Sequence, residues 1–206
     1  MANANIARGL IPYRHFDGSV YNGSFNVYYV PSSYATALYI GDPVDIVSAS
    51  DDSIGTPAVQ LGVVGSPLVG VMIGIVDGGP DGAIVAVTQG LPIYHPASTA
   101  QYIAVCDDPT VLYMVQDDAS SQATAPKLWA GKNANLVSGS GSTATGYSGW
   151  QMAASTVATT STLDVKIMRP LQQADNVIGT SANTNMNVKW LVSLNNRRYA
   201  NQVAGV

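Results

Sequence analysis

The stretch NVKWLVSL, residues 187–194, decides the fold class. Its apolar residues alternate with polar ones and share one face: Val188, Trp190, Val192 and Leu194. Only Leu191 breaks the alternation. A period of two places every second side chain on the same face of an extended strand. The stretch therefore predicts a strand with one face in the core and the other face towards solvent.

Other stretches carry the same kind of signal. In Leu163–Ile167 every second residue is apolar, which makes Asp164 and Lys166 neighbours on a solvated face. Val111–Val115 is apolar at every position, which is typical of a strand covered on both faces. The other expected strands are Asn26–Val30, Thr36–Ile40, Val44–Val47, Ala58–Val64, Val69–Val76, Ala83–Thr88 and Gln101–Cys106.

Turn signals separate these strands about every ten residues. They are made of Asp, Asn, Gly and Pro, as in Asn22-Gly23 and Asp107-Asp108-Pro109. Gly70 and Gly74 recur inside an apolar strand, which indicates a close backbone approach or a bend that closes a barrel. We therefore expect an all-β fold with a small β-barrel or β-sandwich core.

The chain divides into three expected parts. Residues 1–25 form an extended N-terminal arm, residues 26–118 a β-barrel-like core, and residues 119–206 a second β-rich part. Within the last part, residues 138–149 form a flexible loop, because this segment is rich in Gly and Ser. The same pattern is also compatible with one domain.

Charged residues are scarce in this chain. Its 206 residues include nine Lys or Arg and thirteen acids, all of them Asp, for a net charge of −4. A surface that grips nucleic acid needs clustered Lys and Arg, so nucleic acid is not an expected partner. The exposed residues must be mostly uncharged, and such a surface lacks the repulsion that keeps soluble monomers apart. We therefore expect a chain built to be assembled.

Residue types that often carry catalysis form no catalytic pattern. His95 lies between Pro92 and Pro96, which favours a structural or exposed histidine over a catalytic one. Cys106 ends an apolar strand, which favours a buried and inert thiol. The Asp pairs lack the spacing of a calcium loop. We expect no enzymatic activity, no catalytic residue, no cofactor and no metal site.

Membrane and export signals are not expected either. The most apolar run, Leu68–Val76, has nine residues, far fewer than the roughly 20 that a membrane-spanning helix needs. The first thirteen residues hold no apolar run typical of a signal peptide. The single cysteine forms no disulfide within the chain, which suits a reducing compartment.

Basic and aromatic residues gather near both ends of the chain. The candidate partner-contact residues are Arg8, Tyr13, Arg14 and Phe16 near the start, and Arg197, Arg198 and Tyr199 near the end. Such clusters suit arms that lie on an acidic protein partner, and solvated tails are the alternative interpretation.

Three short motifs resemble a viral protein family. YIGDPV at 39–44, LVGV at 68–71 and DGAIVAV at 81–87 follow the order G-D-x-V, L-V-G-V and G-x-x-x-x-V of tailed-phage capsid decoration (cement) proteins. ARGLIP at 7–12 and WLVSLNNRRY at 190–199 are similar to segments of phage virion proteins.

The resemblance implies a small-barrel or tulip-like all-β fold without enzymatic activity. It further implies homo-oligomers, often trimers, that bind the major capsid protein on the outer face of the head. The protein would be made in the cytoplasm of a bacterial host and end in the virion. Family members often consist of the barrel alone, so the resemblance says nothing about the role of residues after Asp118.

Two other function classes remain open from the sequence. The first is another virion component, namely a major capsid, head-completion or tail protein. The chain is short for a shell protein and lacks the long charged helix of that fold. The second is a glycan-binding β-domain that uses Trp129, Trp150 or Tyr147 as a stacking platform.

Overall fold

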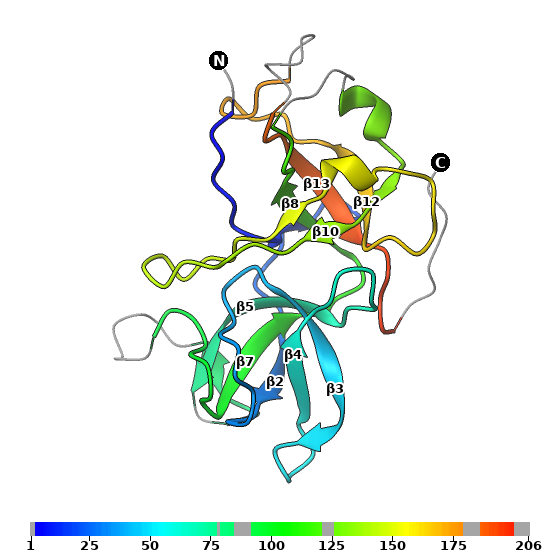
Figure 1. Cartoon of the computed structure of the whole chain (residues 1–206). Helices are drawn as coiled ribbons and strands as arrows, with labels where there is room; N and C mark the ends of the chain where they lie inside the picture. The colour runs from blue at the N-terminus through cyan, green and yellow to red at the C-terminus, as the bar shows by residue number, and fades with distance from the viewer. Residues whose placement is uncertain (1–2, 78, 85–91, 121–125, 179–185, 200–206) are drawn as a thin grey trace.

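The computed structural model describes residues 3–77, 79–84, 92–120, 126–178 and 186–199. Nearly all of its regular structure is β, which confirms the expected fold class. Two sheets account for most of the strands and lie one above the other in Figure 1. No helix in these residues is long and apolar enough to cross a membrane.

The first sheet closes into a barrel. Its strands follow the spatial order β3 (Pro43–Asp51), β4 (Pro57–Leu61), β2 (Asn26–Val30), β7 (Gln101–Cys106), β5 (Gly70–Asp77) and β6 (Ala83–Ile84). Since β3 also pairs with β5, five of these strands form a ring, and β6 extends the edge of β5. The interior is filled mainly by branched and aromatic side chains, among them Tyr28, Val30, Leu38, Val44, Val59, Met72, Ile75, Ile103 and Val105.

The two glycines of β5 have the roles expected for them. A Cβ atom on Gly70 would lie 2.5 Å from the carbonyl oxygen of Cys106, so the neighbouring backbone leaves no room for a side chain. Gly74 follows an irregularity in the pairing of β5 with β7, between Met72 and Gly74. Irregularities of this type bend a strand, which helps a small sheet to close.

The second sheet is entirely antiparallel. Its strands, in spatial order, are β1 (Ile11–His15), β8 (Val111–Gln116), β13 (Lys189–Leu194), β12 (Val165–Pro170) and β9 (Asn133–Ala134). The short strands β10 (Leu136–Val137) and β11 (Gln151–Met152) pair with each other. Within the described residues, the 3-10 turns η2 (Pro126–Trp129) and η3 (Ala154–Thr156) complete the regular structure.

The inner face of the second sheet packs on the barrel. Trp190 and Tyr113 from this sheet share one core with Leu68, Val71 and Cys106 from the barrel. The two parts therefore bury a common hydrophobic surface, and each contributes to the stability of the other.

The outer face of the second sheet carries a smaller apolar cluster. Leu112, Leu171 and Leu191 are buried in it, with Met114 and Met168 packed alongside. Leu191 thus has a physical reason to break the alternation of its strand. The strand β8 is apolar on both faces because it contributes to both clusters, as expected for Val111–Val115.

The boundaries of the expected parts differ from the structure in two places. Residues 111–116, expected in the barrel-like core, form β8 of the second sheet. Residues 11–15, expected in the extended arm, form β1 and pair with β8 along most of its length. Without β1, β8 would leave one edge of the sheet unpaired. Pairing between strands that lie about 100 residues apart in sequence leaves no local signal.

The segment before β1 also lies on its own chain. The side-chain amide of Asn3 donates to the carbonyl oxygens of Val177 and Met186 at 3.1 and 2.9 Å. The amide of Leu10 donates to the carbonyl oxygen of Gly41 at 2.9 Å, and the Leu10 side chain is fully buried. The N-terminal segment is therefore part of the fold and does not reach out as an arm.

Gly9 makes this contact with the barrel possible. Its φ is +68°, and a Cβ atom there would lie 2.2 Å from the carbonyl oxygen of Gly41. Gly18 has a φ of +90° but nothing within 4 Å of such an atom. We predict that Gly9→Ala lowers the free energy of unfolding by at least about 2 kcal/mol more than Gly18→Ala does, because both substitutions carry the backbone strain and only the first adds a clash. Urea denaturation of the two variants measures this difference, and equal losses would contradict it.

Asp164 was expected on a solvated face and is instead buried. Its carboxylate accepts hydrogen bonds from the backbone amides of Gly65 and Leu136 at 2.9 and 2.8 Å. Burial raises the pKa of Asp164, while these two hydrogen bonds lower it. The residue precedes β12, so alternation within the strand does not determine its environment.

The Gly/Ser segment 138–149 was expected as a flexible loop. The structure shows a ribbon hydrogen-bonded to the barrel: Ile40 donates to the carbonyl of Gly146, and Ser148 donates to the carbonyl of Ile40, both at 2.9 Å. A Cβ atom on Gly139 would lie 2.1 Å from the carbonyl oxygen of Gly149. The glycines thus allow two backbone segments to approach closely. Figure 1 shows the ribbon, in yellow-green, extending beside the barrel.

Two other expected strands are incomplete. Thr36–Ile40 holds isolated bridges at Leu38 and Ile40 and no continuous strand. In Ala83–Thr88, the first two residues form β6, and residues 85–88 lie outside the described part of the chain.

Candidate partner-binding surface

Exposed apolar side chains recur along the N-terminal segment. Ile6 precedes β1, Tyr13 lies within it, and Phe16 and Val20 belong to the hairpin that follows. Val20 is the most exposed of them, at 81%. Moving apolar side chains of this size from water into a protein interface lowers the free energy. Tyr13 and Phe16, both expected as contact residues, are therefore available to a partner.

The two arginines of the same segment lie without an acidic partner among the described ion pairs. The guanidinium of Arg8 stacks over the ring of Tyr147, 5.1 Å from its centroid. Arg14 pairs with Leu112 across β1 and β8, and its buried Nε atom has no hydrogen-bond partner. Arg8 is exposed and Arg14 is half-buried, so both bring positive charge to the surface.

The three C-terminal candidates differ in burial and in their partners within the chain. Arg197 is buried, and its Nε atom donates to the carbonyl oxygen of Leu194 at 3.0 Å. Arg198 forms an ion pair with Asp45 of the barrel strand β3, with its Nε atom 2.9 Å from Oδ1. Tyr199 is exposed. The Arg198 side chain therefore ties the C-terminal segment to the barrel, whereas that of Arg197 bonds to the end of β13. Arg198 and Tyr199 are exposed, and Arg197 is not open to a partner.

A groove of about 420 Å³ lies beside the N-terminal segment. It runs between residues 3–11, the strands β8 and β13 of the second sheet, and residues 174–177. Ile6, Ile11, Met114 and Val177 supply its larger apolar side chains. Arg8, Lys189 and Asp175 also line it, and the last two form an ion pair.

Of the residues that line this groove, the sequence pointed only to Arg8. Ile6, Met114 and Val177 come from segments that are far apart in sequence, so their proximity has no local signature. One signal was present: Leu191 broke an alternating strand and thereby indicated a second apolar face.

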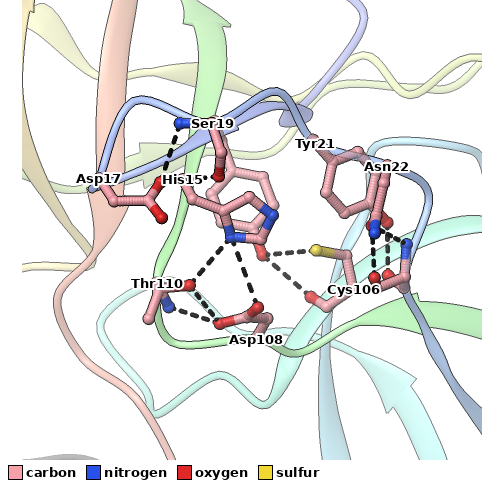
Figure 2. A network of polar contacts seen from close by, with 10 residues as sticks. His15, Asp17, Ser19, Tyr21, Asn22, Cys106, Asp108 and Thr110 are labelled. Carbon is pink, nitrogen blue, oxygen red and sulfur yellow. Dashed lines mark hydrogen bonds and ion pairs between the residues drawn. The ribbon is translucent and has the colours of Figure 1, made fainter.

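A polar network lies where the N-terminal hairpin meets the barrel (Figure 2). The Nδ1 atom of His15 lies 3.0 Å from the hydroxyl of Thr110 and 3.6 Å from the Oδ2 atom of Asp108. Thr110 donates to Asp108 through both its amide and its hydroxyl, at 2.7 Å each. The network therefore ties β1 to the turn between β7 and β8.

The thiol in this network is not set up as a nucleophile. Cys106 is fully buried, as expected, and its sulfur lies 3.4 Å from the hydroxyl of Tyr113, which also donates to the Cys106 carbonyl at 2.9 Å. Burial raises the pKa of the thiol, whereas nucleophilic attack needs the thiolate.

His95 occupies a structural position, the first of the two alternatives that the sequence favoured. It is fully buried, and its Nε2 atom lies 2.8 Å from the carbonyl oxygen of Thr99. Burial lowers its pKa. Among the described residues, no three His, Cys or Asp side chains gather in the manner of metal ligands.

Two of the three proposed glycan platforms are inaccessible. Trp129 and Trp150 are buried in the core shared by the barrel and the second sheet, and Trp129 stacks on Trp190 at 5.4 Å between ring centroids. Tyr147 is half-buried under the guanidinium of Arg8. A flat, open aromatic surface of the kind that stacks on sugar rings is therefore not formed by these three residues.

Comparisons with protein families, with curated proteins and with solved structures find no match to this chain.

Proposed function

We propose that this chain is a non-enzymatic structural protein of a tailed-phage virion. It binds the outer surface of the head and stabilises the joints between capsomers. Its partner is the major capsid protein, and it assembles as a homo-oligomer, with the trimer favoured. The observation that supports this most is the apolar N-terminal surface, where Ile6, Tyr13, Phe16 and Val20 lie exposed and Ile6 also lines an apolar groove.

The physical basis of such a function is buried area repeated many times. Each Å² of apolar surface removed from water contributes about 25 cal/mol, less the entropy lost on association. Separating two capsomers would expose the covered surface again. An acidic chain gains nothing from facing packaged DNA, so the outer surface is the favourable position for a net charge of −4.

A different virion component is the second candidate, because the same surface also suits a head-completion or tail protein. Copy number separates the two. A decoration protein is present in hundreds of copies per particle, whereas a connector or tail part is present in far fewer.

Binding to heads tests the proposal. Purified protein added to expanded heads that lack it should co-sediment with them and raise the temperature at which they rupture. Failure to bind heads in any maturation state would refute it. Binding at a single vertex would instead support the second candidate.

A further inference from the structure

The outer face of the second sheet gathers a large share of the basic residues of an acidic chain. Directly paired residues of antiparallel strands project to the same face. Arg14 pairs with Leu112, and Arg169 pairs with Leu191, and both leucines belong to the outer cluster. The two arginines therefore lie on the outer face.

The same register adds two lysines. Lys189 is two residues from Leu191 on β13 and so shares its face. Lys166 pairs with Ser193, which is also two residues from Leu191. With Arg8, which lines the groove, five of the nine basic residues surround this face. They extend over the full width from β1 to β12, about 14 Å at the usual strand spacing.

Carboxylates are concentrated elsewhere. Asp175 is the one acid among the residues that line the groove. By contrast, the barrel strands and their loops carry Asp42, Asp45, Asp52, Asp77 and Asp81. The face therefore brings five basic residues against Asp175, with Asp17 exposed in the hairpin after β1, and remains net positive on a molecule whose total charge is −4.

From this arrangement we infer that the outer face of the second sheet is the docking surface, and that its occupant is an acidic protein surface. An apolar side chain of the partner fills the groove, and carboxylates of the partner face Arg8, Arg14 and Arg169. The inference rests on the proposed function: the partner is the capsid shell, and the outer face of the second sheet is the surface that binds it. Charge complementarity of this kind directs encounter and fixes register.

Duplex DNA fits the same face less well. Specific DNA interfaces are strongly positive and polar, and they neutralise many phosphates. Here four of the five basic residues are half-buried on a sheet face that carries the apolar outer cluster, and Lys189 is already paired with Asp175. A duplex would leave the apolar side chains of the groove, such as Ile6 and Met114, facing its charged backbone.

Charge-neutralising variants test the inference in the head-binding assay. Arg14→Gln with Arg169→Gln should weaken binding at least about tenfold and flatten its dependence on NaCl concentration, because fewer ion pairs form with the shell. Ile6→Asn, at an exposed position, should weaken binding without changing the salt dependence. Ala97→Asp with Ala100→Asp changes the net charge equally in an exposed barrel loop and should bind like the wild type. Thermal unfolding of each free variant checks that the fold is retained.

The outcomes separate the two proposals. Wild-type protein that does not bind heads refutes the proposed function, and the docking surface with it. Wild-type binding that the Arg14/Arg169 variant retains in full overturns the docking surface alone. Two further experiments measure binding to a 30-base-pair DNA duplex and self-association of the free protein by sedimentation. Tight, salt-sensitive binding to the duplex, or self-association that the same variant abolishes, would assign the face to DNA or to a second copy and overturn the inference.

Discussion

Replacing Asp117 with alanine should lower the free energy of unfolding by about 3 kcal/mol or more. The side chain is fully buried at the end of β8 and accepts three hydrogen bonds. Its Oδ2 atom accepts from the indole of Trp190 at 2.9 Å, and its Oδ1 atom accepts from the amides of Val188 and Ala119 at 3.0 and 3.3 Å. Alanine would leave these donors without a partner inside the core, where each costs about 1–3 kcal/mol.

The neighbouring acid provides a matched control. Asp118 is exposed and accepts one hydrogen bond, from the amide of Ala154 at 2.8 Å. Asp118→Ala should cost less than about 1 kcal/mol, since water can replace the lost acceptor. Urea denaturation with an unchanged dependence on denaturant gives both values. Similar losses for the two variants would show that the Asp117 hydrogen bonds are not what stabilises this end of the sheet.

The second large effect is a dependence of stability on pH that originates at Asp42. This carboxyl group is buried beside the barrel and accepts the amide of Tyr39 at 2.8 Å. Burial raises its pKa to about 6, and hydrogen bonds from Ser148 and Tyr39 oppose the rise. Between pH 3.8 and about 6 the folded state therefore keeps a proton that the unfolded state has lost. The contribution of Asp42 to the free energy of unfolding should fall by about 3 kcal/mol as the pH rises through this window and stay constant above it.

Asp42→Asn isolates that contribution. The amide keeps an acceptor for Tyr39 and can donate to the hydroxyl of Ser148, so the local structure is retained. The free energy of unfolding of the variant, relative to that of the wild type, should increase as the pH rises from 4 to 7. Comparing the two proteins is necessary because burial also raises the pKa of Asp117 to about 6, and the lowered pKa of His95 acts with the opposite sign below pH 6.5. Parallel pH profiles of the two proteins, measured by urea denaturation, would contradict the prediction.

The strands themselves were largely predictable from local pattern. Asn26–Val30 and Gln101–Cys106 coincide with β2 and β7, since alternation and turn residues are local properties. Pairing partners were not predictable in this way. The turn between β7 and β8 resembles an ordinary hairpin in sequence, yet the chain crosses there from the barrel to the second sheet.

The candidate surface was predictable only in part. Basic and aromatic residues near the N-terminus marked Tyr13, Arg14 and Phe16, which do lie exposed or half-buried. The same reasoning marked Arg197 and Arg198, which also bond within the chain: Arg197 is buried, and Arg198 is exposed and paired with Asp45. Composition does not distinguish a cation that binds a partner from one that holds a terminal segment, because that depends on long-range packing.

Imaging of intact particles at subunit resolution tests the central claim most directly. We predict density for the barrel and its attached sheet on the outside of the head, in hundreds of copies over the joints between capsomers, with the outer face of the second sheet against the shell. Particles in which this chain is absent from the head exterior, or in which it occupies only a tail or a single vertex, would contradict the account.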